Sequence, residues 1–336
     1  MNLGLGAHPW DDEALRAAYW RSFSETRAAI QASLGGRAQE ILDDLRLSFE
    51  IFGAAVDDLL AACEAYRAGL SDPRFFDRVN EGARERAILA VRRGTFCAAA
   101  SALALVDHSR RARDRWQLPG YRERINAEFA ENPEHRFVQG LRNYVSHFRP
   151  SSSTWREVIT YGPAGKRETS FVLRADELLA WDAWDSSARE YIRSAPKNVI
   201  DLESLFRGYR DRVAHFQGWL RDLVESIARP ELAQYRHYKD VVDQLASWSN
   251  WNVVIQNFVL KRNLDPYKYL HRYLTPAQLE EVRALPSQSR EQVDRIIELV
   301  DRHRACAYSH RGLPQGEELR MAVYRAFGVA PAEVSS

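Results

Sequence analysis

The chain has 336 residues, which is enough for two domains or one large domain. Its 47 basic and 46 acidic side chains give a formal net charge of +1, which excludes a bulk polycation that coats nucleic acid by charge alone. The 45% hydrophobic and 28% charged fractions are typical of a globular protein with a sizeable core, and they argue against global disorder.

Targeting features and cysteines indicate the cellular setting. Residues 1–13 contain neither a basic region nor a long apolar region, so they do not read as a secretory signal. The longest nearly uninterrupted apolar run, residues 96–106, is well short of the roughly 20 residues of a membrane helix. Cys63, Cys97 and Cys306 are too few and too widely spaced to indicate a disulfide framework or a zinc site. We therefore expect a cytoplasmic protein.

Helical periodicity dominates the chain. Within residues 37–70 and again within 198–227, apolar residues recur at spacings of three and four, the period of one buried helix face. Gly35-Gly36, Pro119-Gly120 and Pro150 predict breaks between helices. We expect helices at residues 11–34, 37–70, 82–116, 132–148, 176–193, 198–227 and 230–260, with shorter ones after Gly120, Thr275, Ser287 or Ser289, and Leu313.

One stretch has strand character. Apolar and β-branched residues at 155–161 and 171–173 flank Gly162-Pro163-Ala164-Gly165, a pattern that predicts a β-hairpin near residues 154–174. The expected fold class is all-α, a multi-helix bundle with one inserted β-hairpin. We expect residues 1–260 to form this helical domain and residues 261–336 to form a small helical C-terminal region.

Few sequence motifs carry recognisable chemistry. The chain has no phosphate-binding glycine loop, no nucleophile elbow and no metalloprotease motif. Its nine histidines include no close cluster of metal ligands; even His303 and His310, seven apart, flank an expected helix end. We therefore expect neither a cofactor nor a metal.

The segment Leu141 to His147, with the sequence L-R-N-Y-V-S-H, closes a predicted helix just before a polar loop. It resembles the motif of the HEPN superfamily, an arginine that precedes a histidine by a few residues and is often followed by a polar residue. The resemblance covers about residues 37–150. It implies an up-and-down helical bundle that forms homodimers, with two motifs facing one cleft.

The same resemblance implies an activity. Many HEPN proteins are metal-independent endoribonucleases of defence, toxin or stress systems, so it implies RNA as the substrate and an antitoxin or defence-system protein as a partner. The implied catalytic residues are Arg142, Asn143 and His147. Some family members carry a modified tyrosine two positions after the histidine, but this chain has Arg149 there.

Spacing alone does not identify the site. With 42 arginines and nine histidines, chance gives about three arginine–histidine pairs at the allowed separations, and the chain has three. They are Arg142 with His147, Arg210 with His215, and Arg304 with His310. Context favours the first, because Asn143 follows its arginine and the motif ends a helix where a substrate has access. Asp211 also follows Arg210, but His215 lies within a long amphipathic helix, and Arg304 is followed by Ala305.

The expected chemistry is RNA transesterification. A histidine near its ordinary pKa exchanges protons with the ribose 2′-hydroxyl or the leaving 5′-oxygen, while an arginine holds the phosphate. The products would be a 2′,3′-cyclic phosphate and a 5′-hydroxyl. In a regular helix Asn143 and His147 share a face, so Asn143 is placed to orient the imidazole. Arg142 and His147 lie about 140° apart around the axis, which favours a cleft shared by two protomers.

Two other interpretations stand beside the nuclease. In the first, the protein is a non-catalytic helical scaffold: Arg142 pairs with Glu131 or Glu134, Asn143 caps a turn and His147 bonds a carbonyl. In the second, the bundle binds a nucleotide or another small ligand, and a closed pocket lies between its helices. Trp181 and Trp184 are expected to pack in a core or an interface rather than to stack on bases.

Overall fold

A computed structural model describes residues 8–130, 132–149, 153–160, 166–300 and 316–330. Helices dominate it, and its strands form one three-stranded sheet, so the expected all-α bundle with an inserted hairpin is confirmed. The chain divides into two compact units, which we name the central unit (Ala38–Arg229) and the terminal unit (Met1–Arg37 with Pro230–Ser336). The third match to the motif, Arg304 with His310, lies outside the described residues.

This division differs from the expected one near residue 260. The reason is that the helix beginning at Arg229 packs its apolar face on the C-terminal helices, so it belongs with them. The terminal unit contains α1 (Asp12–Arg21), α2 (Phe23–Ala32), α10 (Arg229–Val253), η6 (Val254–Leu260), η7 (Pro266–Arg272), α11 (Pro276–Ala284), α12 (Arg290–Val300) and α13 (Gly316–Ala326).

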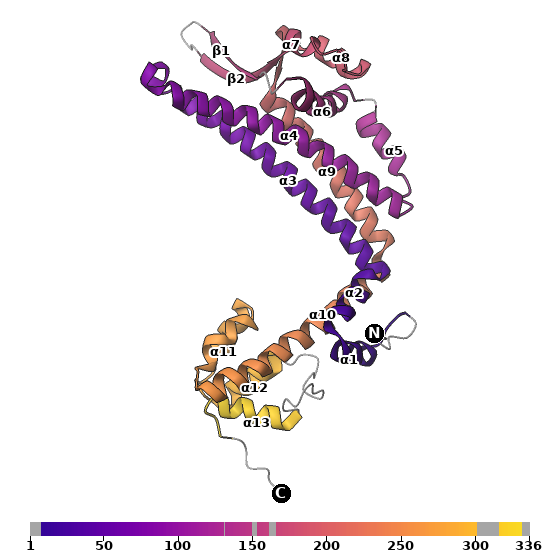
Figure 1. Ribbon diagram of the computed structural model, residues 1–336, viewed down its shortest axis with the longest axis vertical. Coiled ribbons are helices and arrows are strands. Elements are labelled where there is room, and N and C mark those ends of the chain that lie inside the picture. The colour runs from indigo at the N-terminus through magenta and orange to yellow at the C-terminus, as the bar shows by residue number, and fades with distance from the viewer. Residues whose placement is uncertain (1–7, 131, 150–152, 161–165, 301–315, 331–336) are drawn as a thin grey trace. The chain divides into compact units, whose positions relative to one another are not determined.

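The central unit is built on long helices (Figure 1). Its elements are α3 (Leu34–Gly69, starting in the terminal unit), η1 (Pro73–Phe76), η2 (Arg78–Asn80), α4 (Glu81–Arg115), α5 (Tyr121–Ile125), η3 (Asn126–Ala130), α6 (Pro133–Asn143), η4 (Tyr144–Phe148), β1 (Thr154–Thr160), β2 (Lys166–Arg174), α7 (Ala175–Leu179), α8 (Ser186–Arg193), η5 (Pro196–Asn198), β3 (Val199–Asp201) and α9 (Leu202–Ile227).

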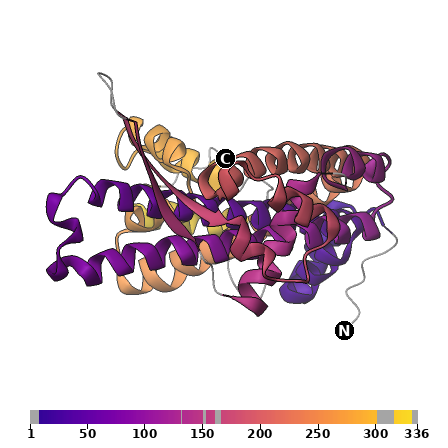
Figure 2. The ribbon, with the colours of Figure 1, turned by 90° about the horizontal axis from the view of Figure 1, so that it is seen from above.

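Helices α3 and α4 run alongside each other from the turn that joins them (Figures 1 and 2). They approach closely at Gly94, where an added Cβ would lie 2.8 Å from the Leu59 Cα. On α9 the predicted apolar stripe is confirmed, because Leu202, Phe206, Val213 and the residues between them at the same period are buried. A long amphipathic helix of this kind is stabilised mainly by burying such a stripe.

The predicted hairpin is confirmed and gains a strand. Strands β1 and β2 pair antiparallel with Trp155 opposite Phe171, and β2 pairs antiparallel with β3 with Leu173 opposite Ile200. Sequence periodicity had placed residues 199–201 in the following helix. That helix instead begins after Asp201, whose side chain accepts a 2.8 Å hydrogen bond from the Ser204 amide.

The first predicted helix was expected to end before Gly35, and α2 does end close by, at Ala32, with Ser33 as its C-cap. Gly35 itself does not stop a helix. It lies in the first turn of α3, where an added Cβ would be 2.0 Å from the carbonyl oxygen of Glu231 on α10. Glycine is required here by close backbone packing rather than by helix termination. The first predicted helix is also divided at Ser22, whose hydroxyl accepts a 3.4 Å hydrogen bond from the Glu25 amide and caps α2.

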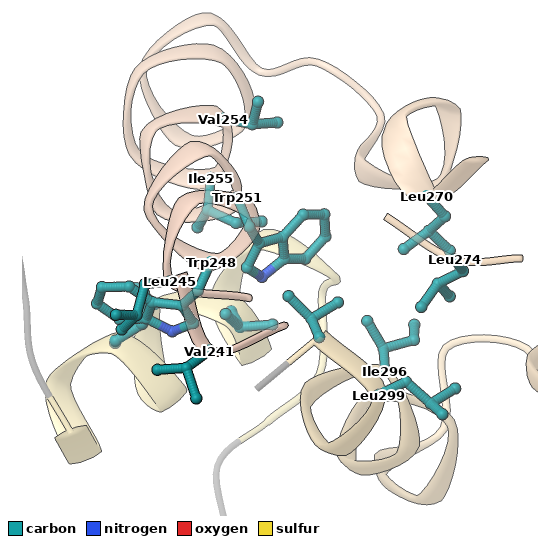
Figure 3. Packing of buried hydrophobic residues seen from close by; sticks show 14 of the residues in the cluster. Val241, Leu245, Trp248, Trp251, Val254, Ile255, Leu270, Leu274, Ile296 and Leu299 are labelled. Carbon is teal, nitrogen blue, oxygen red and sulfur yellow. The ribbon is translucent and has the colours of Figure 1, made fainter. Parts of the chain in front are cut away.

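The core of the terminal unit is aromatic and aliphatic. From α10, Trp251 points toward Leu270 and Leu274, with Ile296 of α12 nearby, whereas Trp248 lies on another side of the helix (Figure 3). The Trp248 ring meets Trp20 of α1 edge-on, with ring centroids 6.2 Å apart. Trp251 is 2% exposed and packs edge-on against Tyr273, with ring centroids 5.0 Å apart. The unit is thus held by one hydrophobic cluster that combines α10 with the C-terminal helices.

The segment Arg78–Arg115, which contains α4, is long and apolar enough to span a membrane by length and composition. In the structure 39% of its most apolar window is buried. The core helix of a soluble protein meets the same criteria, so this feature alone does not assign a membrane location.

Candidate functional site

The motif segment, residues 141–149, ends α6 and continues into η4. Asn132 caps α6 by accepting hydrogen bonds from the amides of Glu134 (3.0 Å) and His135 (3.3 Å), and Pro133 occupies the first helical position. One face of the helix is buried through Phe137, Val138, Leu141 and, beyond its end, Tyr144. The helix is therefore fixed at both ends, which positions the motif.

The end of the motif segment winds as a π-helix. The Arg149 amide donates to the Tyr144 carbonyl at 3.0 Å, an i to i+5 hydrogen bond that makes a wider turn than an α-helix. Because a π turn contains more residues than an α turn, the angle around the helix axis between Arg142 and His147 is smaller than the one expected for a regular α-helix. Single π turns inside helices are often found at functional sites.

The three predicted site residues are arranged as follows. Arg142 is half-buried, and its Nη1 donates a 3.0 Å hydrogen bond to the Asn143 Oδ1. His147 is exposed, and among the described residues its ring has no hydrogen bond or ion pair. The structure therefore brings Arg142 and Asn143 together. It does not show the expected Asn143–His147 contact, because the amide oxygen of Asn143 faces the guanidinium instead.

The ion pair that a scaffold role predicts for Arg142 is not formed with Glu134. That carboxylate is engaged by Arg212, with 3.1 Å between Arg212 Nη1 and Glu134 Oε1. Desolvation by burial raises the pKa of Glu134, while Arg212 lowers it. Glu131, the other partner considered, lies outside the described residues.

The alternative pair on α9 is committed to other contacts. Arg210 Nη1 binds Asp57 Oδ1 at 2.6 Å, which joins α9 to α3. The ring of His215 lies 3.2 Å from Arg124 Nη2 and 3.5 Å from Glu128 Oε1. The geometry therefore favours Arg142 with His147 over Arg210 with His215.

An aromatic cluster packs against the buried side of the motif segment. Trp184, between α7 and α8, is 5% exposed and stacks on Tyr144 with ring centroids 5.6 Å apart. It also stacks on Phe137 at 5.4 Å, and its indole Nε1 donates a 2.7 Å hydrogen bond to the Leu178 carbonyl. Its packing fits the expectation for this tryptophan, because a buried indole with a satisfied N–H is a rigid support.

A cavity lies between helices of the same unit, where the small-ligand interpretation expects a pocket, but sequence reasoning did not identify the residues that line it. It has a volume of about 220 Å³ and is bounded by α4, α5, η3, α6 and α9. Buried His135, Tyr209 and Gln217 line it together with Arg110, Arg113 and Arg136. One sequence signal was present: Gln217 interrupts the apolar stripe of α9, and a polar residue on a buried stripe marks a polar contact inside the core.

The residues of the motif segment supply acid–base and phosphate-binding groups but no metal site. Among the described residues, no group of three or more His, Cys, Asp or Glu side chains is placed to hold a metal ion. Comparisons of the chain with models of protein families, with curated proteins and with solved structures give no match. Function is therefore inferred from the residues and their geometry.

Proposed function

We propose that this protein is a metal-independent endoribonuclease whose active site contains Arg142, Asn143 and His147. The observation that carries the proposal is that neither Arg142 nor His147 has an ionic partner among the described residues. Among the described residues the Arg142 guanidinium has a hydrogen bond only with the neutral Asn143 side chain, and His147 is exposed with its ring unpaired in the described part of the chain. A guanidinium without a carboxylate partner is available to bind phosphate.

The proposed reaction is attack of the ribose 2′-oxygen on the adjacent phosphorus. His147, in its neutral form, accepts the 2′-hydroxyl proton, and the bond from phosphorus to the 5′-oxygen breaks. The 5′-oxygen takes a proton to become a hydroxyl, which leaves a 2′,3′-cyclic phosphate. Arg142 donates to the non-bridging phosphate oxygens and stabilises the charge that builds up on them in the transition state.

A homodimer fits this chemistry. The base must be a neutral imidazole and the acid a protonated one, so one His147 cannot serve both roles in a single step. Two copies of the motif segment facing one cleft supply two imidazoles, one to act as the base and the other as the acid. The proposal therefore includes a second copy of the chain as the partner that completes the site.

The alternative is a non-catalytic scaffold with the same fold. It predicts an Arg142 tied into a buried salt bridge, whereas Arg142 is half-buried and bonded to Asn143, with Glu134 occupied by Arg212. These contacts favour the nuclease over the scaffold.

The test is cleavage of a fluorescent RNA oligonucleotide in EDTA, with the end groups of the products identified by mass spectrometry. We expect His147→Ala to lower the cleavage rate about 100-fold or more, the usual loss for a general acid–base. His215→Ala is the matched control, because it removes the exposed histidine of the competing pair, and it retains activity. Unchanged cleavage in His147→Ala, with an unchanged circular-dichroism spectrum, would exclude the proposed site.

A further inference from the structure

The cavity of the central unit has the size and walls of a small-ligand site. Its volume of about 220 Å³ exceeds the roughly 150 Å³ of an engineered apolar cavity that binds benzene. Leu105, Val106 and Val213 supply aliphatic walls, and Phe129 and Phe216 supply aromatic ones. The rings of Phe129 and Phe216 pack edge to face, with centroids 5.2 Å apart. An aromatic ligand can pack against such rings in the same edge-to-face or offset manner.

The interior of the cavity carries one unsatisfied acceptor. Gln217 is 3% exposed, and its Nε2 donates a 3.2 Å hydrogen bond to Ser109 Oγ. Because the Ser109 hydroxyl donates its own proton to the Leu105 carbonyl at 2.8 Å, it must accept from Gln217, which fixes the orientation of the amide. The Gln217 Oε1 is then buried without a hydrogen-bond donor among the described residues. A ligand that enters the cavity satisfies it only with an N–H or O–H group.

The mouth of the cavity is cationic. Arg110, Arg113 and Arg136 line it, and none of its described lining residues is Asp or Glu. Arg110 lies 3.5 Å from Asp107 and Arg113 lies 2.6 Å from Asp114, so both are paired with carboxylates. The side chain of Arg136, which is half-buried, has no hydrogen bond or ion pair within the part of the chain that the structure describes. An anionic group on the ligand would form an ion pair with the Arg136 guanidinium.

We propose that this cavity binds a small single-ring aromatic acid that carries a hydroxyl group opposite its carboxylate. The ring occupies the apolar space, the carboxylate binds Arg136 at the mouth, and the hydroxyl donates to Gln217 Oε1. This site is separate from Arg142, Asn143 and His147, and it does not depend on the proposed nuclease activity.

The test measures binding to the full chain by isothermal titration calorimetry, with 4-hydroxybenzoate as the probe. Three relatives of the probe each lack one feature: benzoate lacks the donor, 4-hydroxybenzyl alcohol lacks the charge, and hexanoate lacks the ring. We expect 4-hydroxybenzoate to bind at least tenfold more tightly than each of them. Absence of measurable binding, or tighter binding of hexanoate, overturns the proposal.

Variants assign the two polar contacts. Arg136→Met weakens 4-hydroxybenzoate at least tenfold but leaves 4-hydroxybenzyl alcohol unchanged, whereas Arg122→Met, an exposed arginine of α5 that does not line the cavity, changes neither. Gln217→Leu removes the preference for 4-hydroxybenzoate over benzoate. Equal effects of Arg136→Met and Arg122→Met, in chains whose circular-dichroism spectra match the parent, overturn the proposed site.

Discussion

The ring of His135 on α6 shares a 2.9 Å hydrogen bond with the hydroxyl of Tyr209 on α9, deep between the helices of the central unit. Burial, together with the positive charges of Arg136, Arg212 and Arg110, lowers the pKa of His135 to about 4. Its nearest carboxylate in sequence, Glu134, is bound to Arg212. His135 is therefore neutral at pH 7.

This neutral histidine makes folding sensitive to acid. The unfolded chain protonates it near its ordinary pKa of 6.5, whereas the folded chain does so only near 4. Between these values the unfolded state binds more protons, so stability is fully present above pH 6.5 and falls as the pH is lowered. Through this group alone the free energy of unfolding should fall by about 3 kcal/mol between pH 7 and pH 4.

Urea denaturation of the parent and of His135→Gln across this pH range checks the expectation. The variant should be less stable at pH 7, by about 1–3 kcal/mol, because it disturbs a buried hydrogen bond. The difference should shrink as the pH falls, since glutamine has nothing to protonate. His215→Gln is the control for loss of a histidine at the surface, since the His215 side chain is 73% exposed. Parallel curves for the parent and His135→Gln would show that His135 does not titrate with folding.

The contact between Arg142 and Asn143 predicts how the proposed nuclease responds to charge. Asn143→Asp replaces a neutral acceptor with a carboxylate that holds the guanidinium by a charge-assisted bond, so it competes with the RNA phosphate. We expect kcat/KM to fall about tenfold or more in Asn143→Asp, and to fall less in Asn143→Ala. The reason is that the charge-assisted bond made only by the aspartate contributes roughly 1.5–3 kcal/mol.

Steady-state cleavage of a short oligonucleotide in EDTA measures this order. Ser146→Ala alters an exposed residue of the same turn and should leave kcat/KM unchanged. If Asn143→Asp cleaved RNA as fast as the parent, Arg142 would not be the phosphate-binding group.

Local patterns were sufficient for much of the fold. The three-and-four spacing on α9 predicted which of its residues are buried, because that period is a direct consequence of helix geometry. The run of β-formers around Gly162 to Gly165 predicted the hairpin, although β3 was too short to stand out next to a strong helix signal. Both successes concern contacts within a few tens of residues.

The misses concern contacts between distant segments. Gly35 was interpreted as a helix stop, because nothing near it in the sequence shows that it packs against the backbone of Glu231. The π turn at Tyr144 has no compositional signal, since it differs from an α turn only in its hydrogen bonds. For the motif, sequence placed Arg142, Asn143 and His147 at the end of one helix, but the engagement of Glu134 by Arg212 required the folded structure.

Alanine substitutions at two glycines test how rigidly Trp184 packs against α6. A Cβ added at Gly140 would lie 2.7 Å from Trp184 Cζ3, and this ring is confined by Phe137, Tyr144 and its bond to the Leu178 carbonyl. Overpacking costs about 1–3 kcal/mol, which exceeds or cancels the gain of about 1 kcal/mol in helix propensity. Gly140→Ala should therefore leave the chain no more stable than the parent.

The matched variant is Gly208→Ala on α9. Gly208 is also inside a helix, but it is exposed, and an added Cβ would meet nothing within 4 Å. It should stabilise the chain by about 1 kcal/mol through helix propensity alone. Thermal denaturation of the two variants compares them directly: because both make the same chemical change, their difference isolates the contact with Trp184. An equal rise in Tm for both would mean that Trp184 yields, and that it does not fix the end of α6 on which the motif segment stands.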